Sequence, residues 1–152
     1  MRDNVPDSWR RQSDHVIPVS SHCRHCRETF IHERHACPRC GRGTMTVKPA
    51  STAGVVESWT EIFDPPEEFH RMRPYIIGLI RLDDGARLSA PIVDVESGML
   101  VKGMRVEAVV RKVYVQGQDG LIEYGTKYRP SMKVIKESKP PSGASLAKSG
   151  KQ

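Results

Sequence analysis

The sequence predicts a mainly β protein in two parts, a small cysteine-rich ribbon followed by a five-stranded barrel. All four cysteines lie within residues 23–40 (CRHCRETFIHERHACPRC), as two C-x-x-C pairs separated by ten residues. Five strand-like stretches then follow one another up to residue 130, with no long helix between them. The predicted organisation is an N-terminal helix (1–14), the ribbon (15–48), the barrel (49–130) and a disordered basic tail (131–152).

The first element is a short amphipathic helix, predicted over residues 3–14 (DNVPDSWRRQSD). Asp3 or Asn4 can cap it, and Pro6 suits its first turn. Trp9 is its one large apolar side chain. We expect Trp9 to pack on the ribbon, with anchoring of a partner protein as the alternative.

The cysteine pairs predict a structural zinc site with Cys23, Cys26, Cys37 and Cys40 as ligands. Two such knuckles facing each other supply the tetrahedral sulfur cage that zinc prefers. The ten-residue gap suits a compact ribbon in which one short β-hairpin joins the knuckles, and Gly41 and Gly43 fit the tight turn after the second knuckle. Two disulfides would need an oxidising compartment, and no apolar signal segment precedes the cluster. A redox C-x-x-C usually occurs singly, near a βαβ pattern that is absent here. Rubredoxin-type iron uses the same four ligands, so iron remains an alternative.

Many charged and titratable residues surround the cysteines. The arginines are expected to balance the net negative charge of four thiolates around a dication, so they are weak evidence for nucleic-acid binding. Each nearby histidine can in principle replace a thiolate, but four cysteines already complete the site. The arginines are Arg24, Arg27, Arg34, Arg39 and Arg42, and the histidines are His22, His25, His32 and His35.

The barrel begins with a strand in GVVESWTEIF (54–63), which is rich in β-branched and aromatic residues. The Pro-rich stretch DPPEEFHRMRP (64–74) is predicted to be a loop without an element of its own. Strands in YIIGLIRL (75–82) and RLSAPIVDV (87–95) are joined by a hairpin turn whose Asp84-Gly85 pair is a strong turn signal. Gly78 predicts a bulge or a close backbone approach.

Two further strands complete the barrel, in RVEAVVRKVYV (105–115) and LIEYGTKYRP (121–130). The alternation of apolar and polar residues slips near Lys112, which predicts a bulge. Five short strands without intervening helices favour a five-stranded OB-fold.

The net charge is distributed unevenly along the chain. The total of +6 divides into +3 for residues 1–47, −1 for residues 48–130 and +4 for residues 131–152. Because the barrel is not basic, it is not expected to form a positive groove for nucleic acid. Nucleic-acid binding is kept as the alternative function.

The sequence contains no run of 18 apolar residues, so no membrane span is predicted. Cysteines used as metal ligands and the lack of an export signal predict a cytoplasmic protein.

The order of these parts resembles the zinc-ribbon/OB-fold family of acyl-CoA-associated proteins, over residues 4–130. The resemblance is carried by the four cysteines with Pro38, the Pro65-Pro66 loop, Pro74-Tyr75, RLDDGARLSAPIVD (81–94), KGMRVE (102–107) and YGTKYRP (124–130). The chain departs from the family's Phe-Pro step after the first knuckle, where it has Thr29-Phe30-Ile31. This departure affects the local turn and leaves the metal ligands in place.

The resemblance implies an accessory role. Archaeal members of this family assemble with an acetoacetyl-CoA thiolase and a hydroxymethylglutaryl-CoA (HMG-CoA) synthase of the mevalonate route. They bridge the two enzymes so that a CoA-bound intermediate passes between them at a shared site. The expected function of this chain is therefore that of a non-catalytic bridging subunit.

The residues themselves are compatible with a chain that does no chemistry. The four cysteines are assigned to metal, and His70 is the only histidine of the barrel, without a convincing triad around it. An independent acyl-CoA hydrolase or acetyltransferase is therefore the weakest alternative. If the chain contacts CoA directly, cationic side chains must meet its phosphates and an aromatic or apolar face its adenine. The candidate contacts are Lys127, Tyr128 and Arg129 at the end of the last strand, with Arg71 and Arg73 in the Pro-rich loop. The alternative is that the charged residues are solvated and that Tyr128 is buried in the barrel, which is the expectation for Tyr128.

Overall fold

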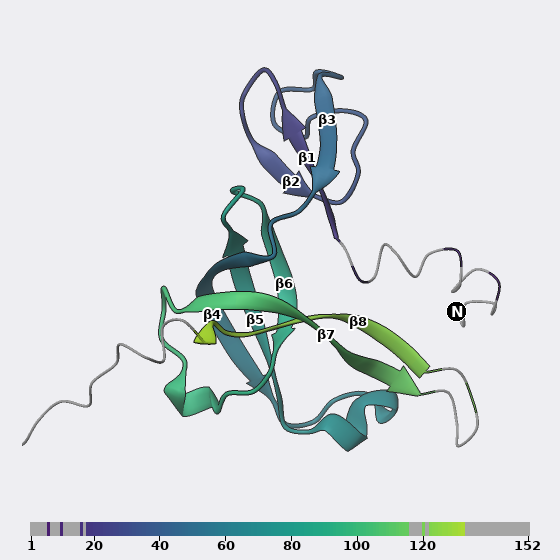
Figure 1. The fold of residues 1–152 in the computed structure, drawn as a ribbon, viewed down its shortest axis with the longest axis vertical. Helices are drawn as coiled ribbons and strands as arrows, with labels where there is room; N and C mark the ends of the chain where they lie inside the picture. The colour runs from purple at the N-terminus through teal and green to yellow at the C-terminus, as the bar shows by residue number, and fades with distance from the viewer. Residues whose placement is uncertain are drawn as a thin grey trace, which may run out of the picture.

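The computed structural model describes residues 18–115 and 122–132, together with Pro6, Arg10, Val16 and Gly120. The predicted N-terminal helix and the predicted disordered tail therefore lie outside the described residues, apart from these single positions and Ser131 and Met132. Figure 1 shows the ribbon at one end of an elongated molecule and the barrel below it.

The ribbon is a three-stranded antiparallel sheet in the order β2-β1-β3. Its strands are β1 (Val19–Cys23), β2 (Thr29–Ile31) and β3 (Met45–Pro49). The sequence predicts a hairpin joining the two cysteine knuckles, but the β1–β2 hairpin instead encloses the first knuckle. The reason is that Cys23 is the last residue of β1, so Cys26 lies in the turn that leads to β2.

The barrel is closed, with strand order β4-β5-β6-β8-β7 and β7 pairing back onto β4. Its strands are β4 (Ala53–Ile62), β5 (Tyr75–Leu82), β6 (Arg87–Ile92), β7 (Arg105–Val115) and β8 (Ile122–Pro130). All pairs are antiparallel except β6 with β8, which meet in parallel at Ile92 and Tyr128. This is the closed five-stranded arrangement of an OB-fold, so the predicted fold is confirmed.

An apolar core fills the barrel. Val56, Ile80, Val106 and Tyr128 are almost completely buried in it. In β4 the register shifts between Val56 and Ser58, which is a β-bulge. The extra residue changes which side chains face inward, so Trp59 packs against the core while Ser58 is exposed.

Two sequence predictions about strand irregularity are resolved by the structure. The predicted slip in β7 is confirmed by a register shift between Lys112 and Tyr114. Gly78 lies in a regular part of β5, but a Cβ there would collide with the side chain of Ile92. The group that approaches Gly78 closely is therefore a side chain rather than the backbone that was predicted, and the bulge is not at this position.

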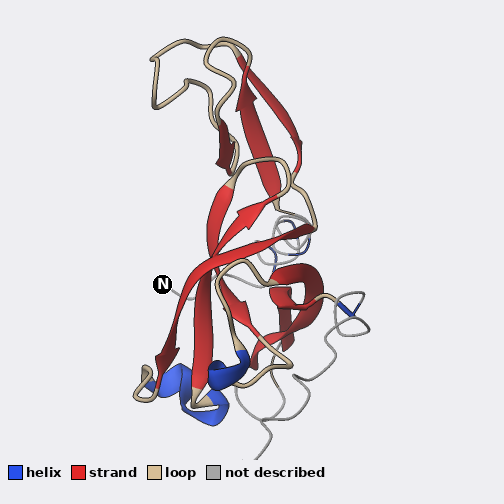
Figure 2. Ribbon diagram, turned by 90° about the vertical axis from the view of Figure 1, so that its left-hand side faces the viewer, coloured by secondary structure: helices blue, strands red, loops and turns tan. Residues whose placement is uncertain are grey.

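The Pro-rich stretch is not a loop without an element, as predicted, because it contains a 3-10 helix, η1 (Glu67–Met72). Pro66 precedes it and its carbonyl accepts a hydrogen bond of 2.8 Å from the Phe69 amide. A 3-10 turn needs only such i→i+3 bonds, so a segment bounded by prolines can still form one. A second short helix, η2 (Ser97–Met99), follows β6, and Figure 2 shows the helical turns at the end of the barrel far from the ribbon.

β6 is shorter than predicted. It ends at Ile92 rather than at residue 95, because the chain turns away at Asp94, whose φ of 60° is in the left-handed region. Before it turns, the Val93 amide donates a hydrogen bond of 2.8 Å to the Tyr128 carbonyl. The barrel is closed by this short contact between β6 and β8.

The segment between β3 and β4 connects the ribbon to the barrel. Ala50 is buried in the barrel core, and Ile31 of the ribbon packs against the same core. The two carboxylate oxygens of Asp84 accept hydrogen bonds from the Ser51 and Ala86 amides, at 3.3 and 3.0 Å. The β5–β6 turn therefore holds the connection in place.

No helix in the described parts of the chain is long and apolar enough to cross a membrane.

Candidate metal centre and barrel pocket

The two cysteine knuckles have the same backbone geometry. In the first, the Cys23 amide donates to the Glu28 carbonyl at 2.9 Å and the Arg27 amide donates to the Cys23 carbonyl at 2.9 Å. In the second, the Cys37 amide donates to the Arg42 carbonyl at 3.0 Å and the Gly41 amide donates to the Cys37 carbonyl at 2.8 Å. The repeated pattern turns each pair of thiols toward the centre of the ribbon.

The residue after each second cysteine adopts a left-handed conformation, with φ of 60° at Arg27 and 71° at Gly41. Glycine adopts this conformation without the steric penalty that a Cβ brings. The role expected for Gly41 in the turn is therefore confirmed, and Arg27 takes the equivalent position in the first knuckle. Gly43 does not have positive φ in this structure.

The four sulfur atoms form one cluster. The Sγ atoms of Cys23, Cys26, Cys37 and Cys40 all lie within 4.8 Å of one another. Across the two knuckles, Cys23 Sγ is 3.7 Å from Cys40 Sγ, and Cys26 Sγ is 3.5 Å from Cys37 Sγ. A tetrahedral ion bound to four sulfurs at about 2.3 Å separates those sulfurs by about 3.8 Å. The donor set therefore fits a tetrahedral metal ion.

The thiols affect one another's ionisation. Hydrogen bonds, first of all from the Cys26 amide, lower the pKa of Cys23 to about 6 although the side chain is buried. The Glu28 amide acts to lower the pKa of Cys26, but burial and the neighbouring sulfurs raise it to about 11. The same two effects raise the pKa of Cys40 against the influence of the Arg42 amide. Several thiolates in contact repel one another, and a cation at their centre relieves that repulsion.

A buried hydroxyl holds the loop between the knuckles. The Ser21 Oγ donates to the His32 carbonyl at 2.9 Å and accepts from the Arg34 amide at 3.0 Å. His32 itself is in the left-handed region, with φ of 67°. The sequence did not identify Ser21 as part of the site, since a serine in a strand gives no signal of such a role.

The charged neighbours of the cysteines have other contacts. Arg24 donates to the Thr46 hydroxyl at 2.8 Å, and Arg39 pairs with Glu28 at 3.0 Å. The Arg34 guanidinium lies over the Phe30 ring, 5.7 Å from its centre. His22 Nδ1 is 3.1 Å from Thr29 Oγ1, and none of the described histidines belongs to the sulfur cluster.

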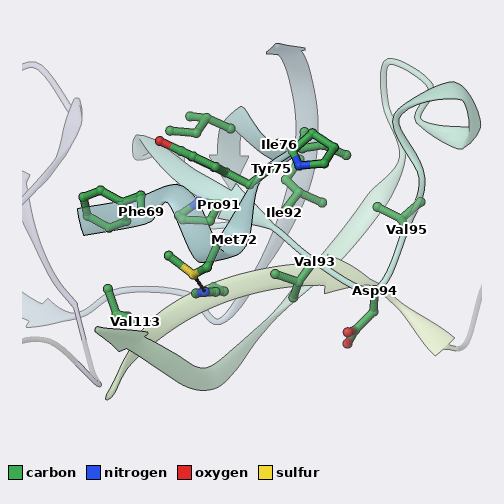
Figure 3. A pocket seen from close by; sticks show the side chains of 13 residues that line it. Phe69, Met72, Tyr75, Ile76, Pro91, Ile92, Val93, Asp94, Val95 and Val113 are labelled. Atoms are coloured by element: carbon green, nitrogen blue, oxygen red, sulfur yellow. Dashed lines mark hydrogen bonds between the residues drawn. The ribbon is translucent and has the colours of Figure 1, made fainter. Parts of the chain in front are cut away.

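The other candidate site is a pocket of about 630 Å³ in the barrel, shown in Figure 3. It lies where η1, the start of β5, the end of β6 and the segment after β6 meet β7 and β8. Most of its lining is apolar, and its two charged residues are Asp94 and Lys127. The lining residues are Phe69, Met72, Pro74, Tyr75, Ile76, Ile77, Pro91, Ile92, Val93, Asp94, Val95, Val113 and Lys127.

The structure does not bring the five candidate CoA contacts together on one face. Lys127 faces the pocket and contacts Met72 of η1, the helix that also carries Arg71. Arg73 caps that helix and is exposed, whereas the Arg71 side chain is outside the described part of the chain. Tyr128 is fully buried in the core, and Arg129 pairs with Glu107 at 2.9 Å.

Tyr128 is a core residue of the barrel. Its hydroxyl is one of the buried polar atoms without a hydrogen-bond partner among the described residues. Burial, together with the negative charge of Asp84, raises the pKa of Tyr128 to about 12. The phenol therefore remains protonated at neutral pH, and its ring is not available to stack on a ligand.

Comparison with known proteins gives relatives over most of the chain. Residues 47–111 match the family model described as ChsH2, C-terminal OB-fold domain. A DUF35 domain-containing scaffold protein of Methanocaldococcus jannaschii is 34% identical over 132 residues, which is 86% of this chain and 94% of the relative.

Two further matches are more distant. A probable enoyl-CoA hydratase alpha subunit of Thermomonospora curvata is 28% identical over 105 residues, which is 69% of this chain and 32% of that protein. The solved structure of the Ltp2-ChsH2(DUF35) aldolase contains a chain that superposes with a TM-score of 0.57 at 21% identity. That match covers 86% of this chain and 96% of the other, and it shows a shared fold.

Proposed function

Because this chain belongs to the DUF35 family of scaffold proteins, we propose that it is a non-catalytic subunit that holds acyl-CoA enzymes together. The observation that carries this proposal is the 34% identity to a scaffold protein over 94% of that relative's length. A match of this extent includes both the cysteine-rich ribbon and the barrel. The shared architecture, rather than one domain, supports a shared role.

The arrangement of the two parts suits a bridging subunit. The ribbon and the η1 end of the barrel lie at opposite ends of the molecule (Figure 1). We propose that the ribbon (15–48) docks one enzyme and the barrel (49–130) docks the other. Contact surfaces at opposite ends allow two partners to bind at once without competing for the same residues.

The metal has a structural role in this proposal. Cys23, Cys26, Cys37 and Cys40 hold one zinc ion, for which the sulfur distances are suitable. A four-coordinate Cys₄ site has no open position for water or substrate, so the ion shapes the ribbon and does not take part in a reaction. Metal analysis of the purified chain by mass spectrometry distinguishes zinc from iron, which the same four ligands also accept.

We propose an acetoacetyl-CoA thiolase and an HMG-CoA synthase as the partners, so that a CoA-bound intermediate passes between them. The resemblance to the archaeal accessory proteins supports this pair. The relative named probable enoyl-CoA hydratase alpha subunit supports the wider class, because a region like this chain forms part of a protein named for an acyl-CoA enzyme.

Among the candidate CoA contacts, Arg73 is the best placed to meet a phosphate. It is exposed beside the pocket and belongs to none of the ion pairs found in the described residues. Arg129 is held by Glu107, and Tyr128 is inaccessible. Any direct contact between this chain and CoA is therefore expected to involve the η1 end of the barrel.

Affinity purification of the tagged full-length chain from its own cells, with mass spectrometry of the proteins that accompany it, tests this function. The proposal predicts stoichiometric recovery of a thiolase and a synthase. A parallel purification with an unrelated tagged OB-fold protein controls for adhesion to the tag and resin. Recovery of the chain alone, or with nucleic acid and ribosomal proteins, would contradict the proposal.

A further inference from the structure

The pocket of the barrel contains a buried cation without a matching anion. The Lys127 side chain is buried, with only 7% of the residue exposed. Its Nζ donates to Met72 Sδ at 3.7 Å, and no carboxylate among the described side chains forms an ion pair with it. A thioether is a weak acceptor, whereas an ammonium group has three donors. Most of the hydrogen-bonding capacity of Lys127 is therefore unused.

Among the described residues that line the pocket, the one carboxylate is already paired. Asp94 accepts a hydrogen bond of 3.0 Å from Arg111 Nη2. Burial lowers the pKa of Lys127, and the positive charge of the nearby Arg111 lowers it further. Taking a charged group out of water without a partner is unfavourable, so an anion that enters this pocket gains a strong interaction with Lys127.

The remaining walls of the pocket are apolar. Eleven of its thirteen lining residues are aliphatic, aromatic, proline or methionine. Phe69 and Tyr75 form one side as a tilted aromatic pair, with ring centres 6.4 Å apart (Figure 3). The volume of about 630 Å³ lies within the range of small-molecule sites, which are mostly apolar with few polar groups that fix orientation.

We propose that this pocket binds an aliphatic carboxylic acid, with its carboxylate on Lys127 Nζ and its chain along the wall formed by η1, β5 and β6. A single ammonium group matches a carboxylate of one negative charge. A phosphate ester typically needs more donors, such as a bidentate arginine. Arg111, the arginine that acts on Lys127, is held by Asp94, and the exposed Arg73 is not among the residues that line the pocket. A neutral acyl chain or alcohol would leave Lys127 without an anion. This site goes beyond the scaffold function and does not depend on the identity of the partner enzymes.

Calorimetric titration of the full-length chain with four probes tests the proposal. Octanoate has both the chain and the carboxylate, octan-1-ol has only the chain, acetate has only the carboxylate, and octyl phosphate replaces the headgroup. We expect octanoate to bind on the order of 10-fold to 100-fold more tightly than octan-1-ol, as a charge-assisted hydrogen bond contributes. Acetate should give no measurable binding, and octyl phosphate should bind more weakly than octanoate.

Two variants connect that preference to Lys127. Lys127→Met keeps a long apolar side chain and removes the charge, so it should abolish the preference for octanoate over octan-1-ol. Lys102→Met makes the same substitution at an exposed lysine outside the pocket and should leave octanoate binding unchanged. The NMR signals of the methyl groups of Ile76, Ile77 and Ile92 locate the ligand in the unmodified chain, so the test does not depend on the folding of a variant.

Several results would overturn the proposal. These are equal affinity for octanoate and octan-1-ol, tighter binding of octyl phosphate, or methyl shifts outside the pocket. An absence of octanoate binding would also overturn it, and would leave a partner protein's acidic side chain as the anion for Lys127. None of these outcomes bears on whether the chain bridges two enzymes.

Discussion

The ribbon and the barrel are both small β structures, but their interiors differ in kind. In the described part of the ribbon (18–49), the buried residues are Ser20, Ser21, Cys23 and Cys37. The barrel instead encloses a cluster of aliphatic side chains around Tyr128. Two serines and two cysteines supply little aliphatic surface, whereas the aliphatic side chains of the barrel gain about 25 cal/mol per Å² of surface that they bury. The comparison indicates that the barrel folds on its apolar core, whereas the ribbon depends on the metal ion that we propose for its four cysteines.

Removal of the metal should have the largest effect, and it should be confined to the ribbon. Structural zinc contributes roughly 10–16 kcal/mol to the folding of small zinc domains, and the described part of the ribbon has no apolar core to compensate. After treatment with a chelator, hydrogen exchange should show loss of protection in β1 and β3, with protection retained in β5 and β7. Cys37→Ser should reproduce this pattern without a chelator. Loss of protection in both parts with one midpoint would mean that they form a single cooperative unit.

A substitution that leaves a cavity in the barrel core should destabilise the barrel and leave the ribbon unaffected. Ile80 is completely buried, so Ile80→Ala should lower the free energy of unfolding of the barrel by about 2–5 kcal/mol. Denaturant unfolding of a Trp9→Phe background, in which Trp59 is the remaining tryptophan, measures this by fluorescence, and the metal content should not change. Leu79→Ala, at the half-exposed neighbouring position, is the control and should cost less than about 0.5 kcal/mol. Equal losses from the two variants would contradict the assignment of the core.

Two adjacent serines allow a finer test of the ribbon. Both are fully buried, but Ser21 makes two hydrogen bonds with the loop between the knuckles, whereas the Ser20 Oγ has none among the described residues. Ser21→Ala should therefore destabilise the metal-bound ribbon by about 1–3 kcal/mol, because it removes two hydrogen bonds to the backbone of that loop, each of which contributes about 0.5–1.5 kcal/mol. Ser20→Ala should be neutral or stabilising. Hydrogen exchange in β1 measures both, and a larger loss from Ser20→Ala would contradict the account.

The smallest effect is expected at the surface of the barrel. Arg105 donates two hydrogen bonds to the Asp83 carboxylate, at 2.6 and 2.9 Å, and lowers the pKa of Asp83. A carboxyl group with a lowered pKa stabilises the folded state above its unfolded pKa of about 3.9, and this contribution is lost as the pH falls through the lower folded value.

Because both side chains are nearly half exposed, the pair should contribute no more than about 1 kcal/mol at neutral pH. Asp83→Asn should remove that part of the acid dependence, which unfolding measured from pH 7 down to pH 2 reveals. If the variant lost stability toward acid more steeply than the natural chain, this would contradict the expectation that ionised Asp83 stabilises the folded state.

The sequence was most informative where a residue type has one dominant role. The C-x-x-C pairs correctly predicted a cluster of four sulfurs, and Asp84-Gly85 correctly predicted the hairpin between β5 and β6, where Gly85 has a φ of 90°. The bulge in β7 followed from the alternation of its residues. In each case the signal is local, because a turn or a pleat is determined by neighbouring residues.

The features that the sequence did not give depend on packing between distant segments. The bulge in β4 is determined by the pairing of Val56 and Ser58 with β5. Lys127 was expected to be a charge at the end of the last strand, but the segment from η1 to β5, far away in sequence, buries it. Tyr128 was proposed both as a core residue and as a ligand contact, and the closure of the barrel determines that it lies in the core.

The bridging claim is tested most directly by native mass spectrometry of a mixture of the full-length chain, the thiolase and the synthase. The account predicts one assembly that contains all three proteins, and no association of the two enzymes when the chain is left out. Enzymes that associate equally well without the chain, or that each bind it but exclude one another, would contradict the claim that its two ends dock different partners.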